Sequence, residues 1–129
     1  MENRAIRALL VDDNPEFLEA TAEFLSSSLG LDVLASTGSA DEALDLIRHL
    51  NVDLVLLDLA MPGRSGLDVA REIKRIPNAP KVVILTLHDG DEYRRAAREA
   101  GADGFLTKSE LGDRLLPLIH GLFGRKATR

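Results

Sequence analysis

The chain has 129 residues, 45% of them hydrophobic, and is therefore long enough to bury one core but too short for two domains. Its formal net charge of −5 argues against a nucleic-acid surface, and the absence of cysteine excludes disulfides and thiolate metal sites. The N-terminus has no long apolar run, so neither a signal peptide nor a membrane span is expected and the expected location is the cytoplasm. We expect a single domain over residues 1–129, with residues 124–129 as a frayed tail or the start of a linker.

The first part of the chain alternates short apolar runs with helical periodicity. Ala8–Val11 predicts a buried strand, and the acidic turn Asp12–Pro15 predicts the start of a helix for which Gly30 is a typical stop. Leu31–Ala35 predicts a second strand. Ser39–Glu42 then has the form of a capping box, which predicts the start of a second helix.

The stretch from Asp53 to Gly63 organises the rest of the chain. Its apolar run Leu54–Leu57 predicts a strand buried on both faces of a parallel sheet, and Asp58 stands where that strand ends. Ligands of open α/β sheets bind at the carboxyl ends of the strands. Met61–Gly63 then predicts a tight turn, so Asp58 is expected to be presented to solvent beside a loop of fixed shape.

The remaining elements continue the alternation. Ser65 is expected to cap a third helix. The elements predicted after it are a strand, a helix with a mostly alanine inner stripe, a short strand and a last helix, at Lys81–Thr86, Asp91–Ala100, Phe105–Thr107 and about Leu111–Phe123. Pro117 inside the last helix predicts that this helix is bent or begins later than Leu111.

Five strands alternating with five helices predict an α/β fold with a doubly wound, five-stranded parallel sheet covered on both faces. The strand order 2-1-3-4-5 brings Asp12, Asp13 and Asp58 into one crevice between the first and third strands. Thr86 and Lys108 close the fourth and fifth strands at the same edge.

Three carboxylates this close would repel one another unless a cation joined them. Oxygen ligands with room for waters suit Mg²⁺ better than Zn²⁺. A cation, a hydroxyl and an ammonium around one carboxylate are the groups needed to take up a phosphoryl group, because in-line attack requires little beyond positioning and neutralisation of the oxygens.

The set Asp12-Asp13, Asp58 with Met61-Pro62-Gly63, Thr86 and Lys108 closely resembles the receiver domain of two-component response regulators, a flavodoxin-like fold, over essentially the whole chain. The segments Leu85–Asp89 and Gly101–Lys108 are most similar to receivers of LuxR-type (NarL/FixJ-like) regulators. Ser109 departs from the proline that many receivers place after this lysine.

The resemblance implies that the chain is a signalling switch and not an enzyme with a separate substrate, although receivers promote their own phosphorylation and dephosphorylation. Asp58 would accept a phosphoryl group from a sensor histidine kinase or a phosphotransfer protein, while Thr86 and Lys108 would hold its oxygens. The implied Mg²⁺ ligands are Asp13, Asp58 and the main-chain carbonyl of Ala60, with Asp12 acting through a water.

The same resemblance implies an output route. Phe105 matches the switch aromatic of the family, which is often tyrosine. The face formed by the helix Asp91–Ala100, the strand at Phe105–Thr107 and the last helix is expected to contact an output domain or a second copy. Neither nucleic acid nor membrane is an expected partner of this chain itself.

Several alternatives remain open from the residues alone. A flavodoxin-like FMN binder would need a hydroxyl- and glycine-rich loop where the chain has Asp12 and Asp13, and a dehalogenase-type phosphatase would need a second aspartate two positions after its nucleophile. A receiver-like interaction module without phosphorylation is the main alternative. Asp12 or Asp13 could also simply cap the first helix, and Phe105 could be an ordinary core residue. The three histidines, His49, His88 and His120, are expected at the surface.

Overall fold

The structure is a computed structural model that describes residues 5–28, 30–87 and 90–124. Its strands are β1 (Ile6–Val11), β2 (Leu31–Thr37), β3 (Leu54–Asp58), β4 (Ala60–Met61), β5 (Arg64–Ser65), β6 (Lys81–Thr86) and β7 (Gly104–Thr107). Its helices are α1 (Pro15–Ser26), α2 (Ala40–His49), α3 (Gly66–Lys74), α4 (Asp91–Glu99), the 3-10 helix η1 (Lys108–Glu110) and α5 (Leu111–Leu122). His88, Asp89 and the predicted tail beyond Gly124 lie outside the described residues.

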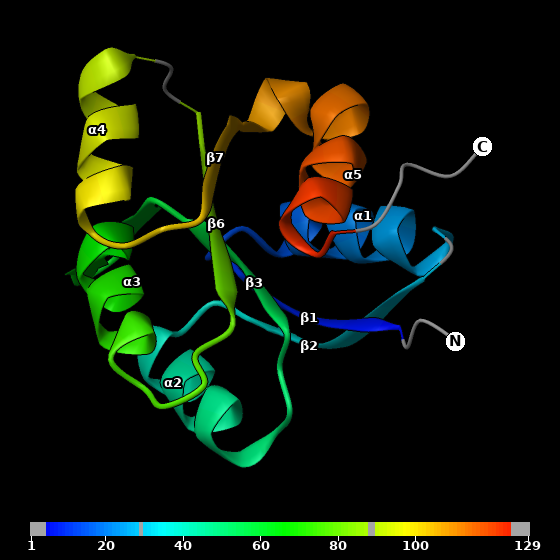
Figure 1. The fold of residues 1–129 in the computed structure, drawn as a ribbon, viewed down its shortest axis with the longest axis horizontal. Helices are drawn as coiled ribbons and strands as arrows, with labels where there is room; N and C mark the ends of the chain where they lie inside the picture. Colours follow the sequence, from blue (N-terminus) through cyan, green and yellow to red (C-terminus); the bar gives the residue numbers. More distant parts are fainter. Residues whose placement is uncertain (1–4, 29, 88–89, 125–129) are drawn as a thin grey trace.

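The main sheet has five parallel strands in the order β2-β1-β3-β6-β7, which confirms the predicted doubly wound order (Figure 1). In its register Val11 lies beside Leu57, and Asp58 lies beside Leu85. The residues that follow β1 and β3 therefore leave the sheet at the same edge, as the sequence predicts for Asp12 and Asp58.

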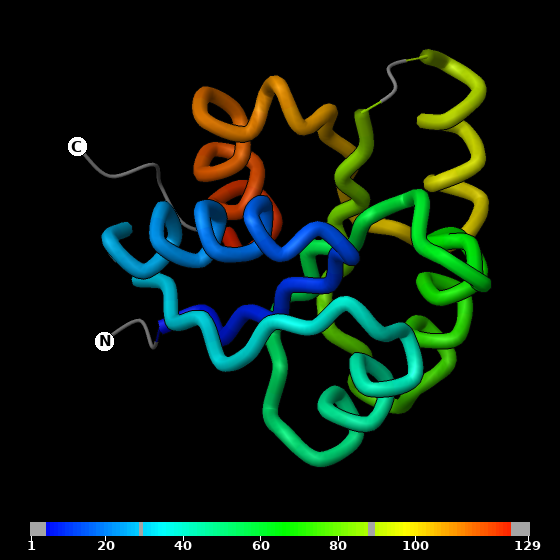
Figure 2. Tube along the Cα trace, turned by 180° about the vertical axis from the view of Figure 1, so that it is seen from behind, coloured from blue at the N-terminus to red at the C-terminus, as the bar shows by residue number. Residues whose placement is uncertain are grey.

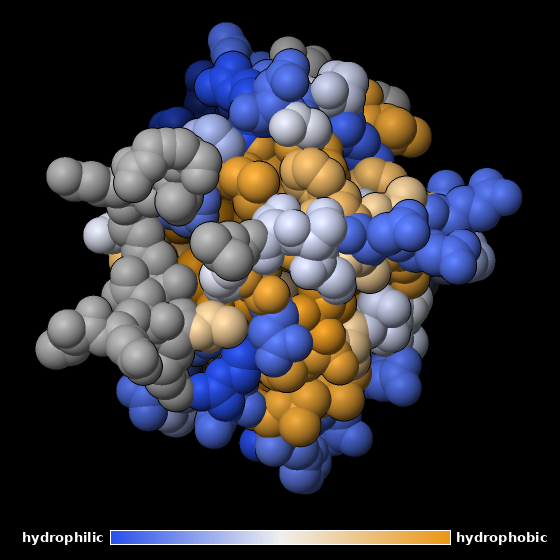
Figure 3. Space-filling model, turned by 90° about the vertical axis from the view of Figure 1, so that its right-hand side faces the viewer, coloured by the Kyte–Doolittle hydropathy of each residue, from blue (hydrophilic) through white to orange (hydrophobic). Residues whose placement is uncertain are grey.

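Helices cover both faces of the sheet (Figures 1 and 2). Alternate residues of each strand enter opposite cores: Leu9, Val55 and Ile84 pack with α2, α3 and α4, whereas Leu10 and Leu56 pack with α1 and α5. Figure 3 looks onto the side where α1 and α5 lie and shows apolar side chains gathered across its middle. The three central strands β1, β3 and β6 are thus buried on both faces, which explains their continuous apolar runs, whereas the edge strands β2 and β7 are only partly buried.

Two local predictions need correction, and one short pair of strands was not predicted. Helix α1 ends at Ser26, four residues before Gly30, where Ser27 closes the last turn through its N–H to the Glu23 carbonyl. Helix α5 begins at Leu111 and not later, because η1 precedes it and Pro117 is accommodated inside it. The antiparallel pair β4 and β5 was not predicted.

The capping box at the start of α2 is only half formed. The Ser39 hydroxyl accepts the Glu42 N–H at 3.2 Å, as predicted. The Glu42 carboxylate, however, accepts from the Thr37 hydroxyl, and that hydroxyl in turn accepts the Ser39 N–H at 3.0 Å. Thr37 thus takes the place that Glu42 has in a complete box.

The surface prediction for the histidines holds for only one of the two that the structure describes. His49 is exposed, with 74% of its side chain accessible, but His120 is half-buried in α5 with its Nδ1 atom out of contact with solvent. The apolar neighbours Leu115 and Ile119 on the same helix are fully buried, which draws the face next to His120 into the core.

Candidate functional site

Three aspartates meet at the carboxyl edge of β1 and β3. Asp12 and Asp58 are buried, at 2% and 6% exposure, whereas Asp13 is exposed. One carboxylate oxygen from each lies within 4.8 Å of the others. The three line a hollow of about 450 Å³, whose remaining walls are Asn14, Pro15, Ala60, Thr86, Leu87 and Lys108. Oxygen donors at this spacing fit Mg²⁺, as the sequence predicts.

Asp12 also has a local structural role. Its Oδ1 atom accepts the Asn14 N–H at 2.9 Å, and Asn14 then caps α1 by accepting the N–H groups of Glu16 and Phe17. The simple capping interpretation of the aspartate pair is therefore wrong, because Asn14 is the cap. Asp12 instead shapes the turn, and its second oxygen remains directed at the hollow.

The ammonium of Lys108 lies between two carboxylates. Its Nζ atom is 2.6 Å from Asp12 Oδ2 and 3.8 Å from Asp58 Oδ1, and only 13% of the Lys108 side chain is exposed. Lys108 is brought here as the first residue of η1, directly after β7. The lysine therefore makes its close ion pair with Asp12 and a longer one with Asp58.

Asp58 carries an unusual proton affinity. Its pKa is raised from 3.8 to about 6, first by burial and then by the negative charges of Asp12 and Asp13, while Lys108 and the Ala60 N–H act to lower it. The Ala60 N–H bond to Asp58 Oδ1 is long, at 3.4 Å. Burial and the neighbouring carboxylates thus disfavour the charged form of Asp58. A bound cation would stabilise that form.

The loop after β3 is held in one shape. Ala60 pairs with Ser65 and Met61 with Arg64, so the predicted turn through Gly63 closes a short hairpin. Arg64 donates to Asp41 on α2 at 2.8 Å and also to Glu72 on α3. These contacts fix the backbone of Ala60, one of the predicted metal ligands, at the rim of the crevice.

The residue after this hairpin must be glycine. A Cβ atom on Gly66 would lie 2.3 Å from the Asp58 carbonyl oxygen and 2.8 Å from the Leu59 Cα. The N-terminus of α3 therefore approaches the end of β3 as closely as backbones allow. This contact helps to set where Asp58 leaves the sheet.

Thr86 and Phe105 lie on neighbouring strands, but only Thr86 reaches the hollow. Thr86 ends β6, is 2% exposed and lines the hollow. Phe105 is half-buried on β7 and lies away from the hollow, with the Arg94 guanidinium 4.8 Å from its ring centroid. Asp12, Asp13, Asp58, Ala60, Thr86 and Lys108 are therefore brought together, whereas Phe105 is not among them.

Two residues of this region were missed from the sequence. Phe17 places its ring 4.2 Å from Lys108 Nζ, and Arg64 ties the Ala60 hairpin to two helices. Phe17 follows the Asp12-Asp13 pair by one helical turn, which is a signal for proximity to the carboxylates, but its pairing with a lysine 91 positions later is not local.

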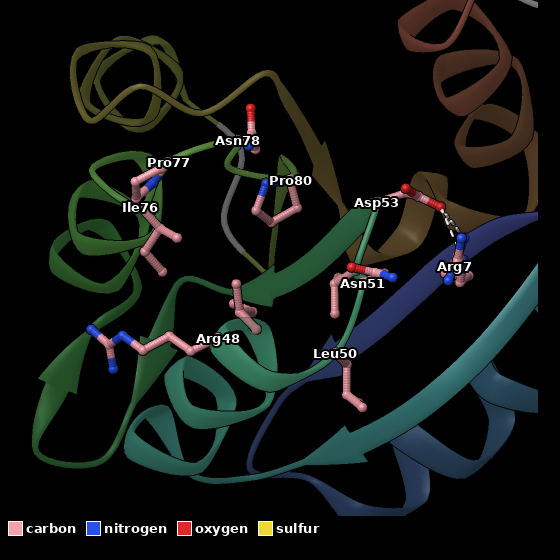
Figure 4. Close-up of a pocket in the computed structure, with 11 residues that line it drawn as sticks. Arg7, Arg48, Leu50, Asn51, Asp53, Ile76, Pro77, Asn78 and Pro80 are labelled. Carbon is pink, nitrogen blue, oxygen red and sulfur yellow. Dashed lines mark hydrogen bonds and ion pairs between the residues drawn. The ribbon is translucent and has the colours of Figure 1, made fainter.

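A larger hollow, of about 580 Å³, lies at the amino ends of β1, β3 and β6 (Figure 4). Its walls include Arg48, Leu50, Asn51 and Pro80, and Asp53 there accepts the Arg7 N–H at 2.9 Å. Parallel sheets bind ligands at the opposite edge. Among the described residues, the clustered carboxylates lie at that opposite edge and not in this hollow.

The chain is a doubly wound α/β protein whose buried carboxylates lie at the switch point, where such sheets bind ligands. A lysine lies beside these carboxylates. Comparison with known families identifies the family of this protein: residues 8–120 match the response regulator receiver domain, and the chain belongs to that family. Response regulators are the signalling proteins of two-component systems.

Two bacterial response regulators are among the relatives of this chain. The chain is 35% identical to the nitrate/nitrite response regulator protein NarP of Escherichia coli, over 99% of this chain and 59% of NarP. It is 31% identical to response regulator GacA of Pseudomonas aeruginosa, over 92% of this chain and 55% of GacA. The chain therefore spans somewhat more than half the length of these two relatives.

Solved structures of response regulators are similar to this chain. A LuxR-family two-component response regulator from Aurantimonas sp. superposes with a TM-score of 0.87 at 34% identity, covering 96% of this chain and 89% of that one. The receiver domain of a putative NarL from Mycobacterium tuberculosis gives 0.80 at 29% identity, covering 94% and 95%. None of the described helices combines the length and apolarity needed to cross a bilayer.

Proposed function

We propose that the chain is a phosphorylation-dependent switch in which Asp58 accepts one phosphoryl group from a sensor histidine kinase or a phosphotransfer protein. The observation that carries the proposal is the placement of Asp58. Its carboxylate ends a buried strand, faces the hollow, shares it with two further aspartates and lies 3.8 Å from the Lys108 ammonium.

The reaction class is an in-line phosphoryl transfer. A carboxylate oxygen of Asp58 forms a bond to phosphorus while the bond from phosphorus to the donor nitrogen or oxygen breaks, and the leaving atom takes the electron pair. Lys108 and Thr86 both line the hollow, and in this proposal their ammonium and hydroxyl groups hold the transferred oxygens. Both groups act by positioning and by neutralising charge.

The residues that would hold Mg²⁺ are Asp13, Asp58 and the Ala60 carbonyl, with Asp12 acting through a water. Bound there, the ion supplies positive charge to the phosphoryl oxygens and offsets repulsion among the carboxylates. This assignment is supported by the all-oxygen donor set within 4.8 Å, and it agrees with the raised pKa of Asp58, which is caused first by burial and then by the neighbouring negative charges.

The proposed output is the face formed by α4, β7 and α5, used to contact an output domain or a second copy of the chain. Helix α4 has one fully buried residue, Ala97, so it is held by little apolar area. A hollow of about 290 Å³ lies where α4 meets β7, lined in part by Ala97, Arg98 and Phe105. Elements held this weakly move at low free-energy cost.

Intact-mass measurement after incubation with a small phosphodonor tests the proposal. We expect one phosphoryl group per wild-type chain with Mg²⁺, none after chelation and none for Asp58→Asn. Asp32→Asn, an exposed carboxylate on β2, is the matched control and should label normally. Labelling of Asp58→Asn equal to that of the wild type would refute the assignment, and a wild type that never labels would favour a receiver-like interaction module.

A further inference from the structure

Within the described part of the chain, the ammonium of Lys108 contacts three side chains from three separate elements. Asp12 Oδ2 at 2.6 Å belongs to the turn after β1, Asp58 Oδ1 at 3.8 Å ends β3, and the Phe17 ring centroid at 4.2 Å belongs to the first turn of α1. A lysine side chain is a flexible stem ending in a compact charge, so the stem alone does not fix where that charge lies. Its position is set by these neighbours.

The Phe17 ring is itself held firmly. Its backbone N–H donates to the Asn14 side chain at 3.2 Å, which fixes the first turn of α1 relative to Asp12. The half-buried ring packs against the core formed with α1 and α5. Its apolar surroundings include Leu10, Leu56 and Leu85. An aromatic face with this backing attracts a cation by its quadrupole, and more strongly because Lys108 is only 13% exposed.

We infer that Phe17 is a positioning residue, whose ring holds the Lys108 ammonium within reach of the phosphoryl oxygens on Asp58. The inference rests on the proposed function of Lys108 and deepens it. Asp12 cannot do this alone, because a cation bound by the three carboxylates would compete with Lys108 for Asp12. The Phe17 ring does not bind the cation held by the carboxylates. It therefore stays in contact with the Lys108 ammonium throughout the reaction.

Two substitutions distinguish the effect of the aromatic face of Phe17 from the effect of its apolar bulk. Phe17→Leu keeps an apolar side chain in the same core but removes the aromatic face, whereas Phe17→Tyr keeps the face. We expect Phe17→Leu to lower the rate constant of phosphorylation by a small phosphodonor, at saturating Mg²⁺, by about two- to tenfold. Phe17→Tyr should stay within about twofold of the wild type, because its ring attracts the ammonium in the same way.

A double-mutant cycle distinguishes positioning from general packing. In a Lys108→Ala background, Phe17→Leu should have no further effect on the rate, because the ammonium that the ring holds is gone. An equal loss in both backgrounds would assign Phe17 to the core alone and overturn the inference. A faster reaction for Phe17→Leu would also overturn it, because the ring would then hold the lysine away from the phosphoryl group.

A measurement independent of phosphorylation completes the test. The ring current of Phe17 should shift the side-chain methylene signals of Lys108 in NMR spectra of the unphosphorylated protein, and Phe17→Leu should abolish that shift. Unchanged Lys108 signals would overturn the inference whatever the phosphorylation assay shows. If the wild type is not phosphorylated on Asp58 but the Lys108 signals move, the contact stands and the proposed function fails instead.

Discussion

Replacing Asp58 by asparagine should stabilise the unphosphorylated protein, and the gain should depend on pH. The pKa of Asp58 in the folded protein is raised from 3.8 to about 6, chiefly by burial. The folded chain therefore binds this proton more tightly than the unfolded chain. The stability that the protonated carboxyl contributes is fully present below about pH 3.8 and is lost as the pH rises through about 6.

The size of the effect follows from the pKa shift. One pKa unit corresponds to about 1.36 kcal/mol, so the shift is worth about 3 kcal/mol over the whole titration, of which the wild type loses about 2.4 kcal/mol of unfolding free energy between pH 4 and pH 7. Asparagine has nearly the same shape and does not titrate. The free energy of unfolding of Asp58→Asn, relative to the wild type, should rise by this amount over the same interval.

Urea unfolding in the presence of a chelator, repeated from pH 4 to pH 8, measures this difference. Subtracting the two proteins at each pH cancels the carboxylates that lie far from Asp58, because they titrate alike in both. Asp32→Asn, on the exposed face of β2, should give a difference that does not change in this way. A difference between Asp58→Asn and the wild type that is flat with pH, or that falls as the pH rises, would refute the reasoning.

Two further predictions concern the backbone and the output face. Gly66→Ala should lower the free energy of unfolding by about 2 kcal/mol or more, because its Cβ would meet the Asp58 carbonyl oxygen. Gly112→Ala on α5, with open space around it, should be neutral or stabilising in the same urea assay. A beryllium fluoride complex that mimics the phosphoryl group should change amide hydrogen exchange most between Asp91 and Thr107, and changes confined to the aspartates would show that the signal leaves by another surface.

The central strands were predictable because they are buried on both faces, so a continuous apolar run such as the one within Lys81–Thr86 was sufficient to locate each of them. The carboxylate crevice followed from strand order, since Asp12 and Asp58 must leave the sheet at one edge. The hairpin of β4 and β5 was not predictable, because two-residue strands have no periodicity. It depends on Arg64 reaching two helices that precede and follow it in the chain.

The contact between Phe17 and Lys108 was missed for a similar reason. Each residue alone has an ordinary role, one as an apolar residue of an amphipathic helix and the other as a surface charge. Only the parallel pairing of the strands brings the start of α1 beside the end of β7. Local sequence patterns carry no information about contacts between residues so far apart in the chain. They do predict local contacts such as the helix cap at Ser65, whose hydroxyl accepts the Leu67 N–H at 3.1 Å.

The bridge that Arg64 forms to Asp41 and Glu72 makes one side of the crevice stiffer than the other. On one side, the hairpin bearing Ala60 is clamped to Asp41 and Glu72, so its backbone is preorganised and loses little entropy when a ligand arrives. On the other side the crevice is lined by Thr86 and Leu87 at the end of β6, and the next helix along the chain, α4, has only one buried residue. If Asp58 is phosphorylated as proposed, we expect the resulting strain to be relieved toward α4, because the bridge holds the hairpin on the other side in place.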